Sequence, residues 1–316
     1  MSASLDSFGD AISALGDRLG DTRPLPLAIA LALHTLSLAV RARVWRNILR
    51  SAFPGRAVST SGVFWAYLAG VGANAIAPIR GGDIVRIQAA RRLIPGASIA
   101  TVVSTLVAET IFGLVVIVGL GMWAVWSGGL PPLVHLHDAK AFEFSFYADH
   151  AWPVLLAALA LVAMIAVVLR AAAGRARELT RHVAAGFRVL RTPTTFIRVV
   201  ALPQSADWVL RGATAYAMLT AFNIHPSVHA TVLVLVVDSV ATAIPFTPGG
   251  GGAQQALLAF ALAGMASQGK ILAFSLGQQA VITAANIVLG IVALLKIFGH
   301  VRTRRPNLVE PIPDAK

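Results

Sequence analysis

Two apolar stretches of this chain are each interrupted by a segment rich in proline and glycine. The interruptions read NAIAPIRGGD at residues 74–83 and AIPFTPGGGG at residues 243–252. Inside hydrocarbon every backbone N–H and C=O needs a partner, so non-helical chain is tolerated there only where protein buries it or water reaches it. A corresponding pair of breaks, one in each half, is the best sequence indication of a transporter's binding site.

The composition places the chain in the membrane class. Of its 316 residues, 57% are hydrophobic and only 13% are charged. Several apolar runs are long enough to cross a bilayer core of about 30 Å. We therefore expect an all-α polytopic membrane protein with a single transmembrane domain at residues 24–298. Cysteine is absent, which excludes disulfides and thiolate metal sites.

The net charge of +12 raises the possibility of nucleic-acid binding, but the position of the charges argues against it. Twenty of the 26 basic residues lie in four short segments beside apolar runs, at residues 41–56, 80–92, 170–198 and 296–305. This is the pattern of cytoplasmic loops, where basic residues also attract anionic headgroups. It predicts an inner-membrane protein with its N-terminus outside and a cytoplasmic tail at residues 299–316.

The order of apolar runs predicts an inverted repeat, with halves at residues 24–126 and 199–298. Each half reads as a span, a hairpin broken at one of the two motifs, and a second span, with opposite orientations in the bilayer. The hairpins are interpreted as re-entrant, with full crossings as the alternative. The first span is expected to end near residue 40, and the second half is expected to open with a crossing at residues 199–222. An N-terminal amphipathic segment at residues 1–23 and a connecting span at residues 153–169 complete the prediction.

Charged groups at membrane depth cost about 2.5–3.5 kcal/mol each on insertion scales and usually face a cavity or a partner. Arg80 and Arg86 suit phosphate or carboxylate, because a guanidinium binds two oxygens and stays charged when desolvated. Asp83 and Glu109 would orient these arginines or carry a coupling proton. The alternative is a buried ion-pair cluster that only holds the first hairpin to its neighbour.

Three further features are weighed in the same way. Asp207 and Arg211 are four residues apart and are expected to pair, mainly in a structural role, whereas Asp238 could face the same cavity as the arginines. The segment containing Pro248, Gly249, Gly250 and Gly252 precedes a new helix whose free N–H groups would suit an anion, although tight packing or a hinge is the alternative. A metal site at His135, His137 and Asp138 is not expected, because no further ligand run accompanies them.

The order and spacing of these residues resemble the transmembrane region of the lysylphosphatidylglycerol synthase family, which also occurs as a stand-alone, flippase-like membrane domain. The similarity covers about residues 24–298 and is carried by Asn74, Pro78, Arg80, Gly81, Asp83, Arg86, Glu109, Pro245, Pro248, Gly249, Gly250 and Gly252. Where the family usually has Gly-x2-Glu, this chain has GAQQ at residues 252–255. Gln255 can hydrogen-bond a headgroup but cannot carry a proton.

The resemblance implies translocation or presentation of an anionic, polyprenyl-linked or hopanoid-type lipid. The candidate substrate-binding residues are Asn74, Arg80, Asp83, Arg86, Glu109, Asp238, Pro248, Gly249, Gly250, Gly252 and Gln255. The aminoacyl-transfer domain of the full synthases is missing, so neither enzymatic activity nor a cofactor is expected. The second hypothesis is a non-transporting accessory subunit of a lipid-modifying enzyme or glycosyltransferase, and the third is a small-solute transporter of similar design.

Overall fold

The computed structural model describes residues 22–77, 81–127, 177–243 and 253–302. The regular secondary structure of these residues is helical, with no strand among them. Within the described residues, three helices are long and apolar enough to cross a membrane: Pro24–Ala52, Ile99–Ala124 and Gln268–Ile297. The expected all-α membrane class is therefore confirmed. The segment up to residue 21, the connecting span at residues 153–169 and the tail beyond residue 302 lie outside the described residues.

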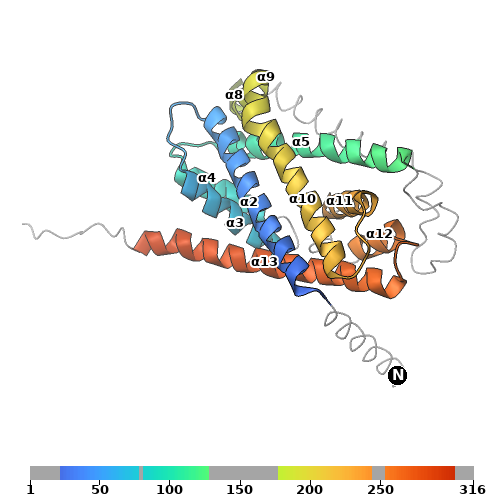
Figure 1. Ribbon diagram of the computed structural model, residues 1–316. Coiled ribbons are helices and arrows are strands. Elements are labelled where there is room, and N and C mark those ends of the chain that lie inside the picture. Colours follow the sequence, from blue (N-terminus) through green and yellow to red (C-terminus); the bar gives the residue numbers. More distant parts are fainter. Residues whose placement is uncertain (1–21, 78–80, 128–176, 244–252, 303–316) are drawn as a thin grey trace, which may run out of the picture.

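Each half of the chain consists of a long helix, a two-helix hairpin and a second long helix (Figure 1). The first half comprises α2 (Pro24–Ala52), α3 (Thr60–Ile76), α4 (Gly81–Leu93) and α5 (Ile99–Trp126). The second half comprises α10 (Leu202–Ala221), α11 (Val228–Ala243), α12 (Ala253–Ala261) and α13 (Gln268–Arg302). Between the halves lie α8 (Arg177–Gly186), the 3₁₀ turn η2 (Arg188–Arg191), α9 (Pro193–Phe196) and the π-helical turn η3 (Ile197–Ala201). Helices stop and restart at both predicted breaks.

The second helix of each hairpin is short for a membrane crossing. The lengths are 13 residues for α4 and nine for α12. At about 1.5 Å per residue they span about 20 and 14 Å, whereas the hydrocarbon core is about 30 Å thick. These lengths fit a re-entrant hairpin better than a full crossing.

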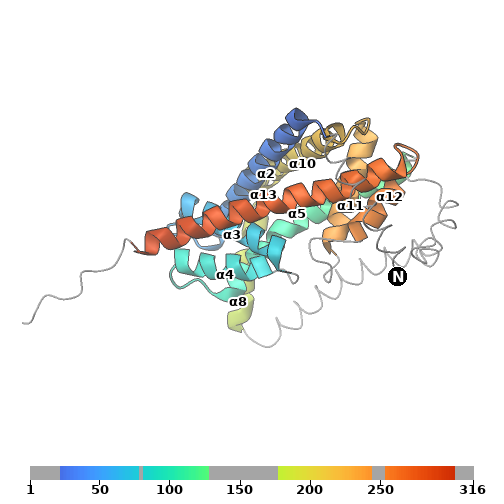
Figure 2. The same cartoon turned by 90° about the horizontal axis from the view of Figure 1, so that it is seen from below.

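Contacts between helices follow a reciprocal pattern. The helix α2 packs along α10, while α3 packs on α13 and α11 packs on α5, so each hairpin rests on the last long helix of the other half. In Figure 1, α3 and α4 lie to the left of α2, and α11 and α12 lie to the right of α10. Figure 2 also shows α2 beside α10. Exchanging the two halves leaves the α2–α10 contact unchanged and converts the α3–α13 contact into the α11–α5 contact. An inverted repeat has this property, although the repeat itself remains a prediction.

Two crossings differ from those expected. The first was predicted to end near residue 40, but α2 continues through the basic run to Ala52, because Trp45, Ile48 and Leu49 in that run are fully buried. The basic run is therefore the polar face of the same helix. Among the described helices, α10 is not one of the three apolar crossings, because Gln204, Asp207 and Arg211 make its sequence too polar.

The first hairpin is held closed by glycine. A Cβ added to Gly82 would lie 1.9 Å from the carbonyl oxygen of Gly70, and one added to Gly70 would lie 2.5 Å from Cγ of Arg86. Gly82→Ala should therefore force α3 and α4 apart and lower the free energy of unfolding by about 1–3 kcal/mol. Thermal unfolding of the detergent-purified protein measures this. Gly119→Ala, where a Cβ meets open space, is the matched control, and equal stability of the two variants would contradict the packing described.

Candidate functional site

Four long helices carry polar and charged side chains in a belt that lies between two apolar cores. On α2, Ala30 belongs to one core and Trp45 to the other, and His34, Ser37 and Arg41 lie between them. The same change occurs on the other long helices, with Thr105 and Glu109 on α5, Asp207 and Arg211 on α10, and Gln278 and Asn286 on α13. Three of these four helices, α2, α5 and α13, are long and apolar enough to cross a membrane, and the belt lies within their length.

Charged residues of the belt, together with Arg86 of α4 and Asp238 of α11, form a connected group. We call this group the polar centre: Arg41, Arg86, Glu109, Asp207, Arg211 and Asp238. Hydroxyl and amide side chains attach to it from the surrounding helices. Three of its members, Arg86, Glu109 and Asp207, are no more than 9% exposed. This part of the polar centre is therefore closed to solvent, whereas the side chain of Arg211 is 34% exposed.

Arg86 on α4 lies in an aromatic and acidic enclosure. Its Nη2 is 2.5 Å from Oε2 of Glu109 on α5, and its guanidinium lies 4.4 Å from the ring centres of both Trp45 and Tyr67. Asp83, one turn earlier and partly exposed, is 3.8 Å away. Within the described residues the buried Nε of Arg86 has no hydrogen-bond partner. The predicted Arg86–Glu109 pairing is thus present, and one donor remains available for another acceptor.

Asp207 joins α10 to α2. Its carboxylate accepts a hydrogen bond from the hydroxyl of Ser37, and its Oδ2 is 3.9 Å from Nε of Arg211. The pairing expected for Asp207 and Arg211 is therefore present. Its geometry is loose, because Arg211 also stacks on Trp208 at 4.7 Å.

Arg41 was not among the predicted site residues, yet it lies at the meeting point of both halves. Its guanidinium is 5.6 Å from the ring centre of Tyr67 and interacts electrostatically with Asp207 and Glu109. It also repels Arg211, so that the two cations share Asp207. The sequence contained a signal for Arg41, because it follows His34 by seven residues and both would share one face of a continuous helix. We interpreted Arg41 instead as the end of the first span.

Asp238 fixes the second hairpin. Its two carboxylate oxygens accept hydrogen bonds from Nε2 of Gln254 at 2.8 Å and Nε2 of Gln278 at 2.7 Å, which joins α11 to α12 and α13. Arg211 interacts with it electrostatically. Gln255 donates to Gln279 of α13. The amide at position 255 is thus part of the contact between the hairpin and α13.

The first break is closed by Asn74, whose Oδ1 accepts a hydrogen bond from the backbone N–H of Gly82 at 2.8 Å. Asn74 therefore links the end of α3 to the start of α4. The other break residues, Pro78, Arg80, Pro245, Pro248, Gly249, Gly250 and Gly252, lie outside the described residues, as do His135, His137 and Asp138. Their predicted roles remain predictions.

The polar centre connects the two hairpins through the α2–α10 pair. From one side to the other the sequence of groups is Arg86, Glu109, Arg41, Asp207, Arg211 and Asp238. We expected the two breaks to meet near the midplane, and this stays a prediction, because residues 78–80 and 244–252 lie outside the described residues. Among the described residues, a line of charged side chains connects the two hairpins.

This architecture defines an all-α integral membrane protein in which two broken hairpins flank a charged interior. Residues 9–290 match the family described as the lysylphosphatidylglycerol synthase TM region. The chain belongs to this family, which confirms the resemblance and relates the protein to lipid handling in membranes. Searches of curated proteins and of solved structures gave no significant match.

Proposed function

We propose that this protein is a lipid translocase of the inner membrane, which moves lipids with a phosphate-bearing headgroup, including polyprenyl- or hopanoid-type lipids that carry one. The observation that supports this most strongly is the polar centre. A single buried ion pair would be enough to hold a hairpin. Six charged groups in a line from one hairpin to the other are more than is needed to hold a hairpin, and inserting them into the membrane costs free energy. Costly charged groups of this kind are typical of substrate pathways.

The headgroup is bound by exchange of partners. Arg86 is paired with Glu109 in the closed structure, and a phosphate would replace that carboxylate with two oxygens of matching geometry. Arg41 and Arg211, which share one carboxylate, provide the next cationic position along the path. The tail of the lipid stays in the bilayer, so only the polar headgroup needs this route.

Movement requires the hairpins to open in turn. Separation of α4 from α5 breaks the Arg86–Glu109 contact, and separation of α12 from α13 breaks the contacts of Asp238 and Gln255. Each side of the membrane would thus gain access through its own hairpin. The proposal involves no covalent chemistry and no cofactor, and it leaves room for a partner enzyme that supplies the lipid.

The proposed orientation has a direct test, because the chain contains no cysteine. We place Ser127, at the end of α5, outside, and the exposed Ala57, between α2 and α3, in the cytoplasm. A membrane-impermeant maleimide added to spheroplasts should label Ser127→Cys and leave Ala57→Cys unlabelled until the cells are lysed. The opposite labelling pattern would reverse the orientation.

Reconstitution in vesicles tests the proposed activity. With a fluorescent phospholipid in both leaflets, dithionite bleaches only the outer leaflet of empty vesicles, and the translocase should expose the inner-leaflet label as well. Absence of movement, together with stable co-purification of a lipid-modifying enzyme, would instead support an accessory subunit. Uptake of a water-soluble compound without lipid movement would support a small-solute transporter.

A further inference from the structure

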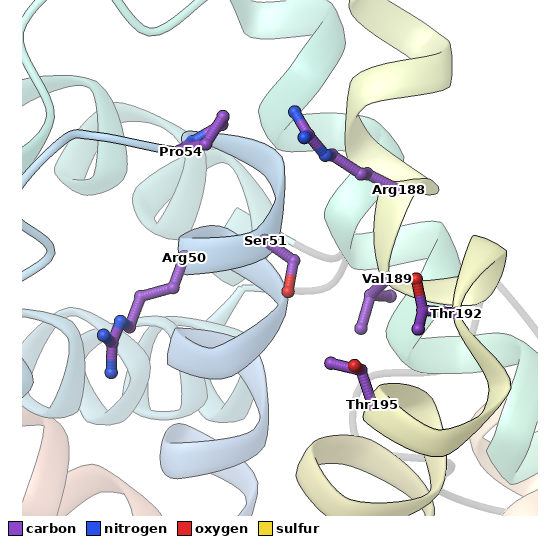
Figure 3. A pocket seen from close by; sticks show the side chains of 7 residues that line it. All are labelled: Arg50, Ser51, Pro54, Arg188, Val189, Thr192 and Thr195. Carbon is purple, nitrogen blue, oxygen red and sulfur yellow. The ribbon is translucent and has the colours of Figure 1, made fainter.

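A surface cavity of about 220 Å³ lies at the C-terminal end of α2, away from the polar centre. It is lined by Arg50, Ser51 and Pro54 of α2 and its end, and by Arg188, Val189, Thr192 and Thr195 of the η2–α9 segment. Figure 3 shows Ser51 facing Val189 and Thr195. Arg188 extends toward the end of α2, and the guanidinium of Arg50 points away from these residues, so it would have to rotate to contact a ligand there. Since a water molecule occupies about 30 Å³ in the liquid, the cavity has room for a phosphate group with part of its hydration.

The lining chemistry matches a phosphate. Two guanidinium groups and the hydroxyls of Thr192 and Thr195 can supply charge-assisted and neutral donors, whereas the Ser51 hydroxyl already donates to the carbonyl oxygen of Asn47. No carboxylate is among the lining residues. Within the described part of the chain, neither Arg50 nor Arg188 takes part in an ion pair. Arg46 on the same helix is repelled by Arg43 and Arg50. An anion bound here would reduce that repulsion.

The walls of the cavity are held in place by contacts outside it. Val189 is 3% exposed and packs in a small core with Val44 and Ile48 of α2. Nδ2 of Asn47 donates a hydrogen bond of 2.8 Å to the carbonyl oxygen of Val199. The two segments that form the cavity are therefore joined on their inner sides, and binding would not require them to assemble.

We propose that this cavity is a second, peripheral site for a phosphate group. It lies where a membrane-crossing helix ends, so the phosphate can belong to a lipid headgroup or to a soluble phosphate compound. The site is separate from the translocation path. Its failure would leave the proposed function unchanged.

The test uses two double variants. The cavity variant combines Arg50→Gln and Arg188→Gln, and the control variant combines Arg43→Gln and Arg198→Gln. Both pairs remove two exposed arginines, but only the first pair lines the cavity. Binding of inorganic phosphate is measured by calorimetry in neutral detergent. The protein is also placed in nanodiscs made of phosphatidylcholine and phosphatidylglycerol and then extracted. Native mass spectrometry measures how much phosphatidylglycerol stays bound to the extracted protein.

Loss of two charge-assisted donors should weaken binding roughly tenfold or more. Loss of phosphatidylglycerol retention in the cavity variant alone identifies a lipid site. Weaker binding of inorganic phosphate in that variant alone identifies a soluble ligand. No phosphate or phosphatidylglycerol binding by the wild type, or equal binding by the cavity variant and its control, would overturn the proposal.

Discussion

Replacing Glu109 by Ala should lower the free energy of unfolding by about 3–5 kcal/mol, because it leaves a buried guanidinium without its partner. Arg86 is 9% exposed. Its other acidic neighbour, Asp83, is 3.8 Å away and partly exposed, so it is a weak substitute. Equilibrium unfolding by SDS in mixed micelles measures the loss. A change below about 1 kcal/mol, the range of exposed pairs, would mean that the pair is solvated.

The double variant Arg86→Met with Glu109→Leu separates stability from function. Replacing both members of a buried pair by apolar residues of similar volume is often neutral or stabilising. We therefore expect this double variant to recover most of the stability that Glu109→Ala loses. If both variants are equally unstable, the contribution of the pair does not come from charge burial.

Replacing Asp207 by Ala should be the second most damaging change, with an expected loss of about 2–4 kcal/mol. The carboxylate is 4% exposed and accepts from Ser37. It also lies between Arg41 and Arg211, which would repel each other more strongly without it. The expected loss is smaller than for Glu109, because Arg211 is 34% exposed and its contact is 3.9 Å long.

Salt distinguishes this variant from a simple packing defect. Repulsion between Arg41 and Arg211 is screened as ionic strength rises, so Asp207→Ala should recover part of its stability at high salt. The control is Ser37→Ala, which removes the hydrogen bond and keeps the charge balance. Equal salt responses of the two variants would argue against the shared-carboxylate arrangement.

The sequence was sufficient for the fold class, the family and both helix breaks, because those depend on local properties. Hydropathy identifies crossing helices, and proline with glycine identifies the positions where helices stop. The pairing of Arg86 with Glu109 was also predictable, since two opposite charges at membrane depth on consecutive helices have few other partners. The C-terminal end of α2 was not predictable, because it depends on what that helix packs against.

The arrangement of the polar centre could not be read from local patterns. Arg41 resembled one more residue of a cytoplasmic basic run, and only the packing of α2 on α3 and α10 brings it against Tyr67 and Asp207. In the same way, Gln254 and Gln278 gave no signal until α12 and α13 met around Asp238. Long-range contacts of this kind combine several helices, and each helix alone shows only one isolated polar residue.

The central claim is that lipid headgroups pass along the polar centre, and transbilayer movement of a fluorescent phospholipid in reconstituted vesicles tests it most directly. The measurement compares the wild-type protein with the double variant that combines Arg86→Met and Glu109→Leu. Both are used at equal protein per vesicle, after it has been verified that both are folded. We predict that the wild type accelerates movement and that the folded double variant does not. Movement at the wild-type rate in that variant would contradict the claim.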